Sequence, residues 1–284
     1  MKLTTEQLEQ YEEQGFLLIP ACFSQEEVAV VRDYIPALMT DDSVVKAWEE
    51  DNKTLRAIVG LHINNEFFRS LVRHPRLLEP ARQLCGSDLY LSRSKIGMKK
   101  AFSGGMWQWH QDAAYSQKLD NSPPPLGVIT FVFLDEVNEF NGPIYFIPGS
   151  HKEGLLNHET NANANRVVNE KSGLEVNYSS IMSYTIMSYT APNTTISRIV
   201  ENRGIVAPKG VAGSVLFCHF LTMHGSAHNL SPFNRDMLGI IYKDINSISP
   251  LKFRGSQDCT PLQTLSKKEV DHLFCANLAT TPIS

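Results

Sequence analysis

The sequence predicts a mainly β protein, a β-sandwich or jelly roll with helices packed on one face. Three observations support this fold class. Residues 1–86 combine helical spacing of apolar residues with helix-capping signals, whereas short runs rich in Val, Ile, Phe and Tyr follow residue 87. No linker separates the two parts, so we expect one domain over residues 1–284 with a mostly helical N-terminal part.

The first two helices are marked by signals at their ends. Each start carries a capping box, in which a Ser or Thr and a Gln or Glu three residues later satisfy free N–H groups: Thr4 with Gln7, and Ser24 with Glu27. Gly15 is expected to end the first helix, and residues 16–20 ("FLLIP") follow as a short strand or extended link.

Two further helical regions follow from spacing and from proline and glycine. The apolar residues of segment 25–39 recur at helical spacing, at Val28, Val31, Ile35 and Leu38. Segment 67–86 predicts two short helices, punctuated at Pro75 and Pro80 and ended by Gly86.

Five runs after residue 87 predict strands, because they are short, apolar or alternating, and separated by turn residues. They are residues 88–99, 126–137, 143–150, 214–220 and 237–245. Residues 157–200 interrupt this rhythm with a stretch rich in Asn, Ser and Thr. A long insertion between strands is typical of a lid, a binding loop or a disordered excursion, and we favour a lid.

Composition excludes several classes of function. The net charge of −4 and the absence of a block of basic residues argue against nucleic acid and anionic membranes as partners. The polar N-terminus does not match a signal peptide, and no apolar run is long enough to span a membrane. The five scattered cysteines form no CxxC pair, which favours reduced thiols and a cytoplasmic location.

The segment "WQWHQDAAY" (107–115) contains a candidate metal site. Alternate residues of an extended segment point the same way, so His110 and Asp112 can reach one point in space. Among the remaining histidines, His224 stands out because Gly225-Ser226 follows it directly and Arg235 opens the next strand. Two histidines and one carboxylate suit Fe(II), which keeps open positions for a co-substrate and O₂. An arginine offers a forked partner for a carboxylate.

These residues lie in motifs that resemble the phytanoyl-CoA dioxygenase family of Fe(II)/2-oxoglutarate oxygenases. The matching stretches are "WHQD" (109–112), "FNGPIYFIPGSH" (140–151) and "HGSAHNLSPFNR" (224–235). Within the family, the chain is most similar to the branch of ectoine hydroxylase and the free L-leucine 5-hydroxylases. The resemblance extends over nearly the whole chain, including the N-terminal "LTxEQxxxYxxxGF" pattern.

The resemblance implies a double-stranded β-helix with His110, Asp112 and His224 as iron ligands. It implies that Arg235 binds the distal carboxylate of 2-oxoglutarate with help from Ser226. Lys95 matches a family lysine that often contacts the co-substrate, with a surface lysine as the alternative. The implied cofactors are Fe(II), 2-oxoglutarate and O₂, and the presence of Asp112 favours hydroxylation over halogenation.

The substrate is expected to be a free amino acid, an amino-acid derivative or another small metabolite. Tyr115, Phe131 and Phe220 should face the cavity mouth. The leucine hydroxylases carry an arginine just before their counterpart of "DCTPL", where this chain has Gln257, so Arg254 is a candidate replacement. An acyl-CoA fits less well because no basic patch for its phosphates is evident. Trp107 and Trp109 are interpreted as core residues.

Three alternatives stay open from the sequence. The same oxidation could end in desaturation, cyclisation or epimerisation. The chain could be a metal-binding β-barrel without catalysis, although intact ligands and Arg235 argue against this. Three ligands with open positions also suit a zinc hydrolase, in which Arg235 would have no evident role. The oligomeric state is not predicted.

Overall fold

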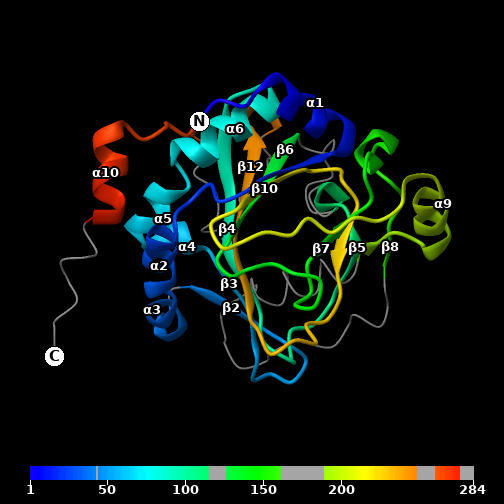
Figure 1. The fold of residues 1–284 in the computed structure, drawn as a ribbon, viewed down its shortest axis with the longest axis horizontal. Helices are drawn as coiled ribbons and strands as arrows, with labels where there is room; N and C mark the ends of the chain where they lie inside the picture. Colours follow the sequence, from blue (N-terminus) through cyan, green and yellow to red (C-terminus); the bar gives the residue numbers. More distant parts are fainter. Residues whose placement is uncertain (43, 115–125, 161–188, 248–259, 276–284) are drawn as a thin grey trace.

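A computed structural model describes residues 1–42, 44–114, 126–160, 189–247 and 260–275, which form two packed β-sheets, a separate two-stranded sheet and flanking helices (Figure 1). The large sheet has the antiparallel order β1-β10-β6-β12-β4-β3-β2. Its strands are β1 (Phe16–Ile19), β10 (Val215–His219), β6 (Gly127–Phe133), β12 (Arg235–Asp244), β4 (Leu89–Lys99), β3 (Leu55–Val59) and β2 (Val45–Trp48). The small sheet has the order β5-β11-β7, with β5 (Trp107–His110), β11 (His224–Ser226) and β7 (Ile144–Phe146).

Strand alternation divides the apolar residues of the large sheet between two cores. In β6, Val128 and Val132 pack with the helices, whereas Ile129, Phe131 and Phe133 pack between the two sheets. All seven residues of β6 are buried, which explains a continuous apolar run instead of an alternating one. The inner core also contains Ile144 and Phe146 of β7, so the two sheets pack against each other.

Helices cover the outer face of the large sheet. They are α1 (Thr5–Gln14), α2 (Gln25–Asp33), α3 (Ile35–Thr40), α4 (Leu61–Asn64), α5 (Glu66–Leu71), α6 (Pro75–Cys85) and α10 (Lys267–Cys275). Residues such as Phe68, Leu77 and Leu78 share one apolar core with Val215 and Leu238 of the sheet. Figure 1 shows α2, α3, α5 and α10 gathered on one side, with α9 (Asn193–Arg203) on the opposite side. None of the helices in the described ranges is long and apolar enough to cross a bilayer.

The local signals of the N-terminal part are confirmed. Both predicted capping boxes form, at Thr4 and at Ser24. Gly15 ends α1 with a φ of 81°, a left-handed conformation that favours glycine. The predicted pair of helices over 67–86 is present as α5 and α6, and Gly86 ends α6.

Three expectations are corrected. The helix predicted over 25–39 is split at Tyr34, because Pro36 lacks an N–H group and opens α3 instead of continuing α2. Pro80 lies inside α6, where its burial in the core accompanies an unbroken helix. The N-terminal part supplies β2 and β3 to the large sheet as well, in addition to β1, which confirms the short strand expected over 16–20. The described parts of segment 157–200 are two short strands, β8 (Glu159–Thr160) and β9 (Tyr189–Thr190), and helix α9; the rest of the predicted lid lies outside the described residues.

Candidate metal and co-substrate site

The three predicted metal ligands meet where β5 and β11 pair. His224 is the cross-strand partner of His110, so two histidines far apart in sequence become neighbours. Asp112 lies two residues beyond His110, and its carboxylate oxygen is 3.4 Å from His110 Nε2. One ligand atom from each of the three residues lies within 4.8 Å of the other two, and no other such group occurs within the described ranges.

The hydrogen bonds of both imidazoles leave Nε2 available to a metal. His110 Nδ1 is 2.6 Å from the carbonyl oxygen of Gln108, and His224 Nδ1 is 3.0 Å from that of Thr222. A carbonyl only accepts, so each Nδ1 carries the proton and each Nε2 keeps a lone pair. Burial lowers the pKa of His224 to about 4, so its ring is neutral at pH 7. This donor set fits a ferrous ion.

The carboxylate of Asp112 is also in the charge state that a metal ligand requires. Burial opposes its ionisation, but its contacts with His110 and His224, together with the charge of Lys95, hold its pKa well below the usual range. The loop that carries it is fixed by Gln111, which is 1% exposed. Gln111 Nε2 donates to the carbonyl oxygens of Leu221 (2.6 Å) and Gly154 (2.9 Å), which ties this loop to the segment leading into β11.

The three candidate ligands line a cavity between the two sheets. About 650 Å³ within it is free of protein atoms, part of this open to solvent. Its wall combines apolar side chains with a few charged ones. The lining residues include Lys95, Trp107, Ile129, Phe131, Ile144, Ser226, Arg235, Met237 and Ile241.

Arg235 presents a buried guanidinium to this cavity. Its Nε and Nη2 donate to the carbonyl oxygen of Gly142, at 3.2 and 2.7 Å, which fixes the orientation of the fork. Burial lowers the pKa of Arg235 to about 10, so the group stays charged at neutral pH. Ser226 and Lys95 also line the cavity, and burial lowers the pKa of Lys95 to about 8. Two cations and a hydroxyl group therefore face the space beside the metal ligands.

Lys99 was not predicted from the sequence. It is 2% exposed and its Nζ donates to Ser226 Oγ (2.9 Å), to the carbonyl oxygen of Gly105 (2.7 Å) and to that of Ala227. Burial lowers its pKa to about 6, and the charges of Arg235 and Arg56 act in the same direction. Its signal in the sequence is alternation, since Lys95, Gly97 and Lys99 occupy the same face of β4.

The aromatic predictions have mixed outcomes. Phe131 lines the cavity. Phe220, expected at the cavity mouth, is 2% exposed in the apolar core between the sheets, because it continues the inward-facing series of Leu216 and Cys218. Trp107, interpreted as core, lines the cavity, whereas Trp109 packs against the apolar face of α9. Tyr115, Arg254 and Gln257 lie outside the described residues.

Three comparisons with known proteins agree with this geometry. An ectoine dioxygenase of Bordetella bronchiseptica is 32% identical over 257 residues, covering 88% of this chain and 79% of that protein. An L-proline trans-4-hydroxylase of Streptomyces griseoviridis is 29% identical over 256 residues, covering 89% and 92%. The crystal structure of EctD from S. alaskensis with 2-oxoglutarate and 5-hydroxyectoine has a TM-score of 0.73 at 21% identity, covering 93% of this chain and 87% of that one.

The structural likeness confirms the predicted double-stranded β-helix fold. The sequence profile of the family described as phytanoyl-CoA dioxygenase (PhyH) matches residues 11–237. Because this match spans most of the chain and the Bordetella relative exceeds 30% identity, the chain belongs to the phytanoyl-CoA dioxygenase family, as its motifs predicted.

Proposed function

We propose that this protein is an Fe(II)- and 2-oxoglutarate-dependent dioxygenase that hydroxylates a free amino acid or a small amino-acid derivative. The observation that carries the proposal is the meeting of His110, Asp112 and His224 in a buried cavity that also contains Arg235. When bound, iron with 2-oxoglutarate and O₂ supplies the oxidising power that attacks an unactivated C–H bond.

The residues of this chain bind, orient and exclude water. His110, Asp112 and His224 would hold the ferrous ion through two neutral imidazoles and one carboxylate. Arg235 would bind the distal carboxylate of 2-oxoglutarate, and Ser226 and Lys95 would supply further hydrogen bonds to this dianion. The small sheet and the inner core shield the reacting groups from bulk water.

A small amphipathic substrate fits the rest of the cavity. Phe131, Ile129 and Ile241 offer apolar contacts, and the related proteins act by name on ectoine and L-proline, both small zwitterions. We keep Tyr115, Arg254 and Gln257 as proposed substrate contacts. The net charge of −4 supports neither nucleic acid nor anionic membrane as a partner, and the free thiols of Cys22, Cys85 and Cys218 are compatible with the cytoplasm.

The decisive experiment supplies Fe(II), 2-oxoglutarate, O₂ and a panel of free amino acids and their derivatives, and measures succinate release. We expect release that depends on one substrate and a product one oxygen heavier. A product that has lost two hydrogens would instead indicate desaturation or cyclisation. An unchanged mass with inverted configuration would indicate epimerisation.

A matched pair of histidine variants tests the ligand assignment. His224→Ala should abolish succinate release and weaken Fe(II) binding, whereas His228→Ala, four residues away on the exposed surface, should change neither. Asp112→Ala should also abolish hydroxylation. If no panel member elicits succinate from the wild-type protein although Fe(II) binds, a metal-binding protein without oxygenase activity becomes the better description.

A further inference from the structure

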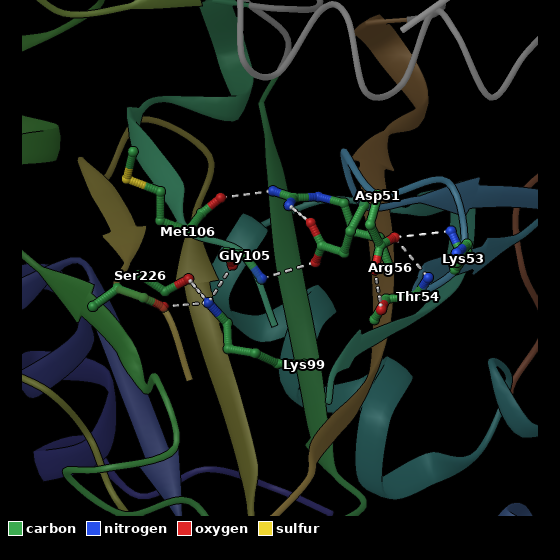
Figure 2. Close-up of polar contacts among 10 residues, drawn as sticks. Asp51, Lys53, Thr54, Arg56, Lys99, Gly105, Met106 and Ser226 are labelled. Atoms are coloured by element: carbon green, nitrogen blue, oxygen red, sulfur yellow. Dashed lines mark hydrogen bonds and ion pairs between the residues drawn. The ribbon is translucent and has the colours of Figure 1, made fainter. Parts of the chain in front are cut away.

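A buried ion pair lies at the end of the β2–β3 hairpin, outside the metal and co-substrate site. Arg56 Nη1, in β3, is 2.6 Å from Glu49 Oε2, one residue beyond β2, and the two side chains are only 5% and 10% exposed. The hairpin turn itself is closed by Asp51, whose Oδ1 accepts from the backbone N–H groups of Lys53 and Thr54 (Figure 2). A buried ion pair gives little net stability because desolvation offsets the attraction between the charges, so stability alone does not account for this one.

Both members of the pair form hydrogen bonds with the backbone of residues 105 and 106, which lead into β5. Glu49 Oε1 accepts from the backbone N–H of Gly105 at 2.9 Å, and Arg56 Nη2 donates to the carbonyl oxygen of Met106 at 2.7 Å (Figure 2). The Arg56 guanidinium lies 3.8 Å from the ring centre of Trp107, in cation–π contact. A side chain at position 105 would put its Cβ 2.5 Å from Glu49 Oε2, so any larger residue there would displace the ion pair.

The same segment is held from its other side by Lys99. Gly105 donates its N–H to Glu49 and accepts through its carbonyl oxygen from Lys99 Nζ, which also donates to Ser226 Oγ. Figure 2 shows the amine of Lys99 between Gly105 and Ser226. A continuous series of polar contacts therefore runs from the hairpin to a hydroxyl group that lines the cavity.

Trp107 connects this network to the cavity directly. Its ring lines the cavity, and its backbone is the cross-strand partner of Ser226 in the small sheet. Lys95 Nζ lies 5.2 Å from the same ring centre, so Trp107 touches a structural cation and a cavity cation. A shift of residues 105–107 would move the cavity wall, Ser226 and the contact with Lys95 together.

We propose that Glu49 and Arg56 are positioning residues for the co-substrate: they fix Gly105, Met106 and Trp107 so that Trp107 and Ser226 are held in place for 2-oxoglutarate. The proposal rests on the proposed function, since it takes 2-oxoglutarate as the ligand of this part of the cavity. It assigns no direct contact between the pair and the ligand. Displacements of about 1 Å by residues remote from the chemistry are enough to weaken a site strongly.

Arg56→Lys is the informative variant, and Arg76→Lys is its matched control. Lysine keeps the charge beside Glu49, so the fold persists, but it loses the fork and the flat contact with Trp107. Arg76 has the same set of contacts in the helical layer: an ion pair with Glu27, a bond to the carbonyl oxygen of Cys22 (2.6 Å), and a position 4.1 Å over the ring of Phe23. It touches no residue of the cavity wall.

Calorimetry on the Fe(II)-loaded protein without oxygen gives the first readout. We expect Arg56→Lys to raise the Kd of 2-oxoglutarate about tenfold and to leave the Kd of Fe(II) within about twofold of wild type. Arg76→Lys should leave both constants unchanged, whatever it does to Tm. An unchanged Kd of 2-oxoglutarate in Arg56→Lys, with a lowered Tm, would assign the pair a purely structural role and overturn the proposal.

Hydrogen exchange of the backbone amides at 105–107, in protein without co-substrate, gives the second readout. Glu49→Gln, which keeps the side-chain shape, and Arg56→Lys should both speed exchange at Gly105, while Arg76→Lys should not. If wild-type protein fails to bind 2-oxoglutarate, the proposed function fails, and hydrogen exchange alone then tests the role of Glu49 and Arg56. Faster exchange in their variants than in wild type supports positioning of Trp107, and unchanged exchange refutes it.

Discussion

Arg235 offers the sharpest test of how the cavity binds its co-substrate. It opens β12 at 5% exposure, and in the sheet it lies opposite Lys99 of β4. Two of its nitrogens are committed to the carbonyl oxygen of Gly142, which holds the guanidinium still and leaves the remaining N–H groups for a ligand. Arg235→Met removes the charge and the fork but keeps an unbranched apolar side chain.

The size of the expected loss of affinity for 2-oxoglutarate follows from the burial of the Arg235 guanidinium. Removing one partner of a desolvated, hydrogen-bonded charge pair costs about 2–5 kcal/mol. At about 1.4 kcal/mol for each factor of ten, the Kd of 2-oxoglutarate should rise at least about 30-fold. Arg235→Lys keeps the charge but presents a single point instead of a fork, so its loss should be smaller.

Calorimetric titration of Fe(II)-loaded protein with 2-oxoglutarate, without oxygen, measures this directly. The Kd of Fe(II) should stay close to that of wild type, because Arg235 is not among the grouped metal ligands. If Arg235→Met binds 2-oxoglutarate as tightly as wild type does, Arg235 does not bind the co-substrate. An equal loss of affinity for the primary substrate and for 2-oxoglutarate would also contradict this role.

Three further outcomes are expected. Gly213→Ala should lower the free energy of unfolding in urea by about 1–3 kcal/mol without changing the Kd of 2-oxoglutarate, because φ is 89° and the new Cβ would lie 2.1 Å from the carbonyl oxygen of Phe23. Burial lowers the pKa of His219 to about 4, below the 6.5 of an exposed histidine. Between these two pH values the unfolded chain therefore binds more protons at this residue than the folded chain does. Tm should fall as the pH drops from 7 to 5, and it should fall less in His219→Asn. Gln111→Met should weaken Fe(II) binding about tenfold in a metal titration, because it removes the hydrogen bond to the carbonyl oxygen of Leu221. An effect on Tm alone would limit Gln111 to a structural role.

The features that the sequence predicted well are those encoded within a few residues. The capping boxes at Thr4 and Ser24 need only a side chain and an amide three positions away, so they form as predicted. The β2–β3 hairpin was missed because its pattern is weak: β3 is buried along its whole length yet contains Arg56, a charge that only its tertiary partners make acceptable. Helix α9 was missed because Asn and Thr dominate its first turn.

The two lysines of β4 could not be distinguished from the sequence of that strand alone. Alternation places Lys95 and Lys99 on the same face, so nothing in the strand itself ranks one above the other. The register with β12 separates them, since Lys99 lies opposite Arg235 and Lys95 opposite Gly239. Register depends on pairing between distant segments, which a single sequence does not reveal, and the resemblance alone had drawn attention to Lys95 only.

The charges around the cavity explain why a dianion belongs there. Within the described ranges, no carboxylate forms an ion pair with Lys95, Lys99 or Arg235, since Glu49 pairs with Arg56 and Asp112 contacts His110 within the candidate metal site. Burial lowers the pKa of these three cations to about 8, 6 and 10, because a charge is unfavourable in this buried environment without an anion nearby. A bound dianion should reduce that penalty and raise the pKa of Lys95 and of Arg235, the two cations that line the cavity. The binding of 2-oxoglutarate should therefore be coupled to proton uptake near pH 8, where Lys95, which lines the cavity, is only partly protonated in its absence.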